Sequence, residues 1–283
     1  MTTVASADIG ASNLRTAIVD IDTLTVSGRS ELDIANDPSR TAEALLVAIR
    51  KLGPPPRRIG IAAAPEFGEN GLVRRWPNRP NYVGFDLLGP LRRAGYDVAV
   101  LDDGMAGAVA AARQGGWSGL CVHIVIGTGI GGGVVLAGQP VVGARGRAMD
   151  IGHLAVPAAT GVPCGCGRTG CLQAVASGRA LAARAADAGL PLDGLDALAA
   201  SGDPNAAAIV ETQLEALAQA IEQVTTLLDP DKITLGAGYA RYAAVATALR
   251  LRLPGDIGAR LFLDALGDNG PLIGAALYAA SGE

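Results

Sequence analysis

The sequence LCVHIVIGTGIGGGVVL, residues 120–136, decides how the fold of this chain is read. Residues 127–132 satisfy a GxGxxG pattern, which in dinucleotide-binding proteins opens a helix so that the helix N-terminus meets a pyrophosphate. Here the following residues, 133–136, continue as a β-branched strand. The stretch therefore predicts a β-hairpin with a tip of glycines, where backbone N–H groups and the Thr128 hydroxyl can approach an anion.

A second turn of this kind lies near the start of the chain. Asp8-Ile9-Gly10-Ala11-Ser12-Asn13 again separates two strand-like runs. We expect the two hairpins to face each other and clamp a triphosphate, although hairpins also favour glycine at turns that bind nothing. Because the strand, turn, strand order begins again at Gly119, the chain is predicted to be a duplicated α/β unit. The expected lobes are 1–117 and 118–269, with a closing helix at 270–283 that can pack on the first.

Composition narrows the class of protein. The chain has 283 residues, of which 49% are hydrophobic and 18% charged, enough to bury one large core or two lobes. A net charge of −4 with interspersed signs gives no basic surface for nucleic acid. Because no charged leader or membrane-spanning apolar run stands out, we expect a cytoplasmic protein without a membrane partner.

Three of the four cysteines, Cys164, Cys166 and Cys171, fall within eight residues. With His153 they supply three thiolates and one imidazole, which is enough for a closed tetrahedral zinc site with a structural role. Such a site would stabilise the insertion at 143–176, which has little apolar content of its own. The alternative is three buried thiols beside an unrelated histidine. The other histidine, His123, lies in an apolar strand and is expected to be a core residue.

The chain resembles the ROK family of actin-like sugar kinases. Residues 8–12 resemble the family's first phosphate motif, 127–133 its second, 235–238 the segment that packs on adenosine, and 270–276 its C-terminal helix. The resemblance implies a two-lobed actin-like (ribonuclease H-like) fold, ATP with Mg²⁺, a structural Zn²⁺ held through a histidine and CxCGxxGC, and a homodimer. It implies ATP contacts at Asp8, Gly10, Ser12, Asn13, Gly127, Thr128, Gly129, Gly236 and Gly238. Asn13 replaces the family's usual lysine, so the first turn should bring no charged side chain to the phosphates.

Asp102 and Asp103 stand between a predicted strand at 97–101 and a predicted helix from about 104 to 113. Aspartates in this position are ordinary N-caps, and a carboxylate here can equally orient and deprotonate an attacking hydroxyl. The residues alone leave both roles open. The match to the family's Asn-Asp-Ala-Asn-Ala motif implies that Asp103 is the catalytic base.

The resemblance also implies the substrate contacts. Asp150 and His153 are expected to bind sugar hydroxyls, because residues 143–153 are similar to the family's Gly-x-x-Gly-x-Ala-Gly-Glu-Ile-Gly-His segment. Gln173 takes the place of a second family glutamate, and Asp102 that of an asparagine. Asn78, in a loop at 76–82, is a weaker candidate.

Asp102 is the most informative of these changes. A carboxylate accepts hydrogen bonds but cannot donate them, and its best partner is a cation. Asp102 and Asp150 together suit an ammonium near C3, as in 3-amino-3-deoxyglucose (kanosamine), a sugar of aminohydroxybenzoate antibiotic pathways. The expected reaction is phosphorylation of its 6-hydroxyl. Glucosamine is the nearest alternative, and glucose fits if Asp102 binds two neutral hydroxyls.

Two other classes of function compete with a kinase. ROK regulators carry a winged helix-turn-helix ahead of the first phosphate motif, and only seven residues precede Asp8 here, which disfavours a repressor. A sugar-binding protein without activity would fit Asn13 and Met105, which both replace polar residues that are usual in the family. Retention of Asp103 and of both glycine turns favours the enzyme.

Overall fold

Both glycine turns close antiparallel hairpins, as the sequence predicted. In the computed structural model, β1 (Thr3–Ile9) pairs with β2 (Asn13–Asp20), and β8 (Leu120–Ile126) pairs with β9 (Ile130–Leu136). The structure describes residues 2–53, 57–68, 70–190, 195–236 and 243–282. The GxGxxG pattern is therefore a hairpin and does not open a helix.

The chain folds into two units. The first comprises Met1–Gly116, Gln139–Ala148 and Asp268–Glu283, and the second comprises Trp117–Gly138 and Met149–Gly267. Residues 139–148 thus group with the first unit, whereas the sequence placed them in the second lobe. In the described part of the chain, no helix combines the length and the apolar character needed to cross a bilayer.

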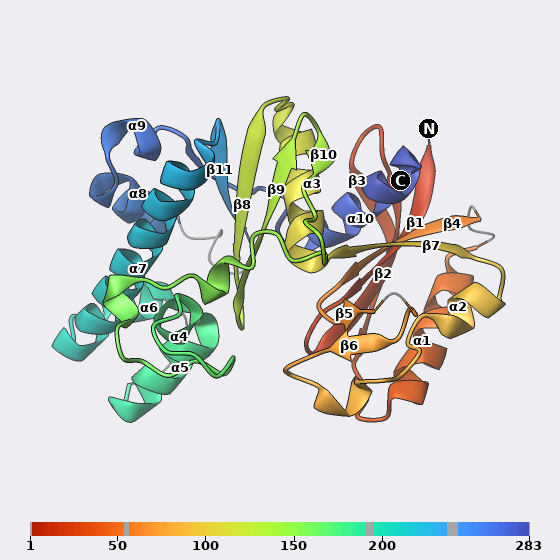
Figure 1. Cartoon of the computed structure of the whole chain (residues 1–283), viewed down its shortest axis with the longest axis horizontal. Coiled ribbons are helices and arrows are strands. Elements are labelled where there is room, and N and C mark those ends of the chain that lie inside the picture. Colours follow the sequence, from red (N-terminus) through yellow and green to blue (C-terminus); the bar gives the residue numbers. More distant parts are fainter. Residues whose placement is uncertain (1, 54–56, 69, 191–194, 237–242, 283) are drawn as a thin grey trace. The chain divides into compact units, whose positions relative to one another are not determined.

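The first unit is built on a sheet with the strand order β3-β2-β1-β4-β7 (Figure 1). The three N-terminal strands are antiparallel, whereas β1, β4 and β7 run parallel, as βαβ crossovers require. The remaining strands of this unit are β3 (Thr25–Asp33), β4 (Arg58–Ala63), β5 (Glu66–Phe67), β6 (Val73–Arg75), β7 (Asp97–Asp102) and β10 (Gln139–Pro140).

Strand β1 is buried on both faces, because helices cover both sides of the sheet. Ala5, Ala7 and Ile9 share a core with residues of α1, while the intervening Ser6 donates its hydroxyl to Leu272 O of α10 at 2.8 Å. Asp8 follows Ser6 on the α10 face.

The helices of this unit are α1 (Pro38–Lys51), η1 (Pro80–Tyr82), α2 (Gly89–Arg93), α3 (Asp103–Gly115), η5 (Gly267–Asn269, which begins at the boundary) and α10 (Gly270–Ser281).

Helix α2 is short because a proline stands at its start. It begins at Gly89, with Pro90 in its first turn. Proline has no N–H to donate and is tolerated only in the first turn of a helix, so the helix cannot extend back through it. Leu87 and Leu88 are buried in an irregular segment instead.

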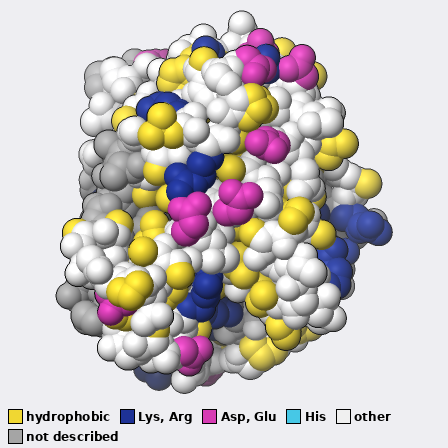
Figure 2. Space-filling model, turned by 90° about the vertical axis from the view of Figure 1, so that its left-hand side faces the viewer, with side chains coloured by type: hydrophobic (Ala, Val, Ile, Leu, Met, Phe, Trp, Pro, Cys, Tyr) yellow, Lys and Arg dark blue, Asp and Glu magenta, His cyan; other side chains and the backbone are white. Residues whose placement is uncertain are grey.

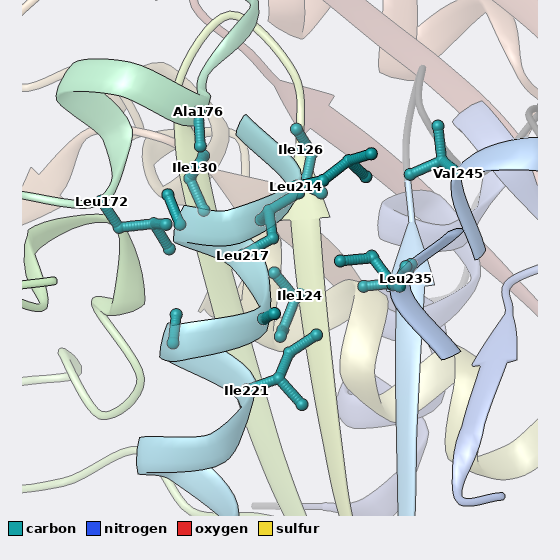
Figure 3. Packing of buried hydrophobic residues seen from close by; sticks show 14 of the residues in the cluster. Ile124, Ile126, Ile130, Leu172, Ala176, Leu214, Leu217, Ile221, Leu235 and Val245 are labelled. Atoms are coloured by element: carbon teal, nitrogen blue, oxygen red, sulfur yellow. The ribbon is translucent and has the colours of Figure 1, made fainter. Parts of the chain in front are cut away.

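The second unit has the strand order β9-β8-β11-β12 in its sheet, with β11 (Lys232–Gly236) and β12 (Leu261–Leu263) parallel to β8. Ile124 and Ile126 of β8 meet Leu214, Leu217 and Ile221 of the long helix α7 (Figure 3). The helices of this unit are η2 (Ile151–His153), η3 (Pro157–Ala159), α4 (Gln173–Ala176), α5 (Gly178–Asp187), α6 (Leu195–Ala200), α7 (Pro204–Leu228), α8 (Ala243–Arg252) and α9 (Gly255–Gly258).

Charges on the surface are mixed in sign. On the face drawn in Figure 2, acidic and basic side chains are interspersed among apolar and neutral ones. Arg252 and Glu211, for example, form an ion pair between α8 and α7. This distribution agrees with the alternating charges of the sequence.

Helix α10 lies unusually close to its neighbours, because glycines line the contact. A Cβ at Gly274 would lie 1.7 Å from Ala106 O of α3, and a Cβ at Gly60 would lie 2.1 Å from Ala275 O of α10. Backbone atoms cannot give way as a flexible side chain can. The packing of α10 on α3 and β4 therefore requires glycine at both positions.

We predict that Gly274→Ala lowers the free energy of unfolding by on the order of 2 kcal/mol or more, because the added methyl forces α10 away from α3. Urea denaturation followed by circular dichroism measures the change. Gly255→Ala is the matched control, since nothing lies within 4 Å of its Cβ position. An equal, small effect of both substitutions would contradict the close-contact explanation.

Candidate functional site

Asp8 is a buried carboxylate at the end of β1. The hairpin register places it opposite Arg15, whose Nη1 lies 3.3 Å from Asp8 Oδ2. Burial and the nearby Asp103 carboxylate raise the pKa of Asp8 to about 7, more than the Arg15 guanidinium lowers it. Asp268 adds a smaller repulsion of the same sign. Asp8 therefore lies near two further carboxylates, Asp103 and Asp268, and one guanidinium, that of Arg15.

The first glycine turn is held by its own backbone. Gly10 N–H donates to Asn13 O at 3.0 Å, and the exposed Ser12 accepts Ile34 N–H at its carbonyl at 2.7 Å. The Asn13 amide donates to Glu31, which also pairs with Arg15. Asn13 brings no charge, as the sequence predicted, but Arg15 two residues later places a cation beside the turn.

Asp102 and Asp103 lie at the N-terminus of α3, in the first unit with Asp8. Asp102 is exposed and caps the helix, since its Oδ1 accepts Gly104 N–H at 3.0 Å and Met105 N–H at 3.3 Å. Asp103 is half-buried, and burial raises its pKa despite a 2.8 Å hydrogen bond from Gly104 N–H. Asp102 is therefore the N-cap of α3, and Asp103 is a half-buried carboxylate whose pKa is raised.

The loop before η1 is anchored to the first glycine turn. Trp76 and Tyr82 pack edge to face in the core, with ring centroids 4.7 Å apart. Arg79 Nε donates to Ala11 O at 3.1 Å, and its Nη1 donates to Ala35 O at 3.3 Å. Asn78 lies in the same loop, so the weak substrate candidate is carried by a segment tied to the turn.

Glu66 of β5 forms ion pairs with three arginines. Its carboxylate is half-buried and lies 2.8 Å from Arg74, 2.7 Å from Arg75 and 3.4 Å from Arg147. These ion pairs lower the pKa of Glu66 against the opposing effect of burial. The contact with Arg147 links strands β5 and β6 to the segment 139–148, which no local sequence pattern could reveal.

The second glycine turn, which ends β8, is supported by a helix N-terminus. Gly178 N–H donates to Gly127 O at 2.8 Å and Arg179 N–H to Thr128 O at 3.3 Å, both from the first residues of α5. Within the turn, Gly127 N–H donates to Gly129 O at 2.9 Å. Thr128 and Gly129 are exposed. The N-terminus of α5 therefore binds the turn's carbonyl groups and fixes the shape of the exposed tip.

Gly236 ends β11 against a buried histidine. A Cβ there would lie 2.5 Å from His123 Cε1, so the imidazole fills the space that a side chain would need. His123 Nδ1 lies 2.7 Å from Thr234 Oγ1, and burial lowers its pKa to about 4, which keeps the ring neutral. His123 is thus a core residue. Gly238, the other glycine of this predicted motif, lies outside the described residues.

The predicted metal ligands meet in the second unit. The ligand atoms of His153, Cys164, Cys166 and Cys171 all lie within 4.8 Å of one another. Cys166 Sγ is 3.7 Å from Cys171 Sγ, and Cys164 Sγ is 3.8 Å from His153 Nδ1. The edges of a tetrahedron with Zn–S bonds of about 2.3 Å are roughly 3.8 Å long. The four side chains therefore fit a structural zinc ion.

The surroundings of this cluster orient its ligands. His153 turns Nδ1 toward the cluster and Nε2 toward Asp150, whose Oδ1 is 4.0 Å away. A hydrogen bond from Arg168 lowers the pKa of Cys166 to about 6, whereas burial raises that of Cys171 to about 12. A bound divalent cation would hold every cysteine ligand as a thiolate.

The predicted site residues thus form two groups. In the first unit, Asp8 and Asp103 lie near each other. Arg15, which was not predicted, lies opposite Asp8 because the hairpin closes at residues 10–12. In the second unit, Gln173 joins the cysteine cluster, since its Nε2 lies 3.5 Å from Cys164 Sγ.

Comparison with known proteins agrees with these features. A model of the ROK family matches residues 4–281. The chain is 40% identical over 195 residues to a kanosamine kinase of Amycolatopsis mediterranei, a match that covers 67% of this chain and 64% of that protein. It is 33% identical to an N-acetylmannosamine kinase of Salmonella typhi over 99% of this chain and 98% of that one.

Solved structures agree as well. A ROK family glucokinase of Streptomyces griseus, in complex with glucose and AMPPNP, superposes with a TM-score of 0.82 and 25% identity, covering 99% of this chain and 100% of that one. The α/β architecture is therefore that of the actin-like sugar kinases, as the sequence predicted.

We predict that Cys166→Ser lowers the amount of zinc bound per chain and lowers the unfolding temperature by about 5 °C or more, because one ligand of a closed site is lost. Elemental analysis and differential scanning fluorimetry measure the two effects. Cys121→Ser is the matched control, because Cys121 is a buried thiol of β8 outside the cluster. Equal zinc content in both variants would exclude Cys166 as a ligand.

We also predict a pH dependence that originates at Asp8. Its pKa is raised from 3.8 to about 7 on folding, so the linked stability is fully present below pH 4 and is lost as the pH rises through 7. In metal-free buffer, wild-type protein should lose on the order of 2 kcal/mol more between pH 5 and 8 than Asp8→Asn.

Urea denaturation at the two pH values measures this difference. Asp97→Asn serves as the control, because Asp97 lies at the exposed start of β7. Parallel stability curves for wild type and Asp8→Asn would show that Asp8 does not carry the shift.

Proposed function

The chain belongs to the ROK family, and we propose that it is an ATP-dependent kinase that phosphorylates the 6-hydroxyl of an aminohexose such as kanosamine. The observation that carries this proposal is the half-buried Asp103 at the N-terminus of α3, with Asp8 near it in the same unit. For phosphoryl transfer, a protein mainly has to position the reacting groups and stabilise the charge of the transition state. Kinase activity is also what the relatives named above have in common.

Asp103 is the proposed base. Burial raises its pKa, and a carboxylate with a higher pKa accepts the proton of an attacking hydroxyl more readily. Asp102 cannot take this role equally well, because its Oδ1 is occupied by two backbone N–H groups of α3. The proton of the sugar 6-hydroxyl would therefore go to Asp103 as the new O–P bond forms, while the bond from the γ-phosphorus to the β,γ-bridging oxygen of ATP breaks and ADP leaves.

Asp8 is proposed to face the Mg²⁺ that accompanies ATP. Carboxylates are ligands that Mg²⁺ prefers, directly or through water. Asp8, Asp103 and Asp268 outnumber the Arg15 guanidinium, so the cluster has an excess of negative charge that a divalent cation would offset. The exposed tips at Ser12, Thr128 and Gly129 are the proposed phosphate contacts, with Gly236 near the adenosine.

The zinc ion is proposed to be structural. His153, Cys164, Cys166 and Cys171 would fill its four positions, and no position is then open for water or substrate. Its contribution is to hold the loop around His153, whose Nε2 faces Asp150. Asp150 and His153 can then be presented together to the sugar.

The amino sugar is favoured by carboxylates on the proposed substrate side. Asp102 and Asp150 accept hydrogen bonds and attract a cation, which suits an ammonium substituent. The 40% identity to a kanosamine kinase supports the 3-amino sugar, although the match spans only 64% of that relative. Glucosamine and glucose are the alternatives, and the relative from Salmonella typhi makes N-acetylmannosamine a necessary comparison. Family membership supports a cytoplasmic homodimer as part of this proposal.

The test is an ADP-release assay with ATP and magnesium on kanosamine, glucosamine, glucose, N-acetylglucosamine and N-acetylmannosamine at equal concentrations. We expect the highest kcat/KM for kanosamine. Preference for a neutral or N-acetylated sugar would refute the ammonium argument and leave the kinase proposal standing. No turnover with any hexose would favour a sugar-binding protein without catalysis.

Asp103→Asn should lower kcat by about 10²- to 10⁴-fold with little change in sugar affinity, because an amide cannot accept the proton. Asp97→Asn is the matched control at the opposite end of β7, where the exposed carboxylate pairs with Arg58. Activity retained in Asp103→Asn would remove Asp103 as the base.

A further inference from the structure

Three carbonyl groups of the first glycine turn face donors of the protein. Asn13 O accepts Gly10 N–H at 3.0 Å, and Ser12 O accepts Ile34 N–H at 2.7 Å. Ala11 O accepts the Nε–H group of Arg79 at 3.1 Å. Because carbonyl oxygens repel an anion, a turn that binds phosphate has to direct them elsewhere and present its N–H groups. Two of the three donors are backbone groups, and the third is a side chain from a distant loop.

The bond from Arg79 sets the orientation of one peptide group. Ala11 C=O and Ser12 N–H belong to the same peptide group, and in a trans peptide group these two bonds point in opposite directions. Ser12 N–H is therefore directed away from the guanidinium. A positive charge at the carbonyl oxygen also polarises the peptide group, which makes its N–H a stronger donor. Since Ser12 is exposed, a ligand can approach the turn at this residue.

Arg79 is itself held at both ends. Its backbone N–H donates to Trp76 O at 2.9 Å, and its backbone O accepts Tyr82 N–H at 3.0 Å, where Trp76 and Tyr82 are buried. At the other end, Nη1 donates to Ala35 O and to Asn36 Oδ1, both at 3.3 Å. These acceptors and Ala11 O are neutral oxygens, so the bonds orient the guanidinium without neutralising its charge.

We propose that Arg79 is a positioning residue of the first glycine turn, which orients the Ala11–Ser12 peptide group so that Ser12 N–H is presented to a phosphate group. The proposal rests on the proposed function in so far as this phosphate belongs to ATP. Arg79 acts through the backbone of the turn and does not itself contact the phosphate. Its side chain takes the place of a backbone donor that the turn lacks at Ala11 O.

The test is calorimetric titration of the full chain with three probes: MgAMPPNP, magnesium tripolyphosphate and adenosine. Arg79→Leu should weaken the binding of MgAMPPNP and of tripolyphosphate by a similar factor, about 10-fold or more, because the N–H donor to the phosphate is misaligned. The affinity for adenosine should not change, since adenosine has no phosphate.

Arg250→Leu is the matched control. Arg250 Nε also donates to a backbone carbonyl, Leu261 O at 3.2 Å, but at the start of β12 in the second unit. The control variant should bind all three probes as the wild type does. Tripolyphosphate affinity of Arg79→Leu equal to that of wild type would overturn the proposal. A loss of adenosine affinity by the same factor as the phosphate probes would also overturn it, because the damage would then not be confined to the phosphate turn.

Arg79→Lys separates positioning from general stability. Lysine keeps a cation and a donor, but its single nitrogen cannot reproduce the fork that spans Ala11 O and Ala35 O. Its tripolyphosphate affinity should therefore lie between those of wild type and Arg79→Leu. If Arg79→Leu does not fold, the comparison is made with Arg79→Lys, and wild-type affinity in that variant would equally refute the role of Arg79.

Turnover distinguishes this proposal from the proposed function. In an active enzyme, Arg79→Leu should raise the KM for ATP by about the same factor as it weakens MgAMPPNP binding. If the wild-type protein binds MgAMPPNP and tripolyphosphate but phosphorylates no sugar, the proposed kinase activity fails, and the binding comparison still decides the role of Arg79. A wild-type protein that binds neither phosphate probe would overturn the presentation of Ser12 N–H to phosphate.

Discussion

The pairing of β1 with β2 is the constraint on which the first half of the candidate site depends. Its register sets Arg15 opposite Asp8 and so provides a cation for a carboxylate that is only 5% exposed. A buried charge without such a partner is costly. The pKa of Asp8 stays high because the carboxylate is buried and because one guanidinium does not balance Asp8, Asp103 and Asp268. The protein thus keeps a charge imbalance in a place where the proposed reaction would bring a metal ion.

The second unit uses the same hairpin with different support. Its turn has no ionised side chain, and the backbone N–H groups of α5 hold the carbonyls of Gly127 and Thr128. The four candidate metal ligands lie in the segment that follows β9, where a Cβ at Gly152 would lie 2.2 Å from Ile130 O. One turn is therefore organised by ion pairs and the other by backbone hydrogen bonds, although both turns look alike in sequence.

Interactions between residues close in the sequence could be predicted, and interactions between distant segments could not. The hairpins and the ligand set of His153 and the cysteines depend on short spacings, and the structure brings those residues together. The contact of Asp8 with Arg15 also follows from a hairpin register, but it was not predicted. The contacts of Glu66 with Arg147 and of Arg79 with Ala11 join distant segments. Such contacts depend on packing and leave no periodic signal, so the sequence could not predict them.

Helix α10 belongs to the first unit, but it is synthesised last. Its buried residues Leu272, Ile273 and Ala276 cover the face of β1 and β4, yet the ribosome adds them after all of the second unit. During synthesis, that face of the N-terminal sheet stays uncovered until α10 emerges. The second unit has its full set of strands and helices earlier and can fold first. The order of folding along the nascent chain is then the reverse of the order of the units, and the uncovered sheet is the part that a chaperone would have to shield.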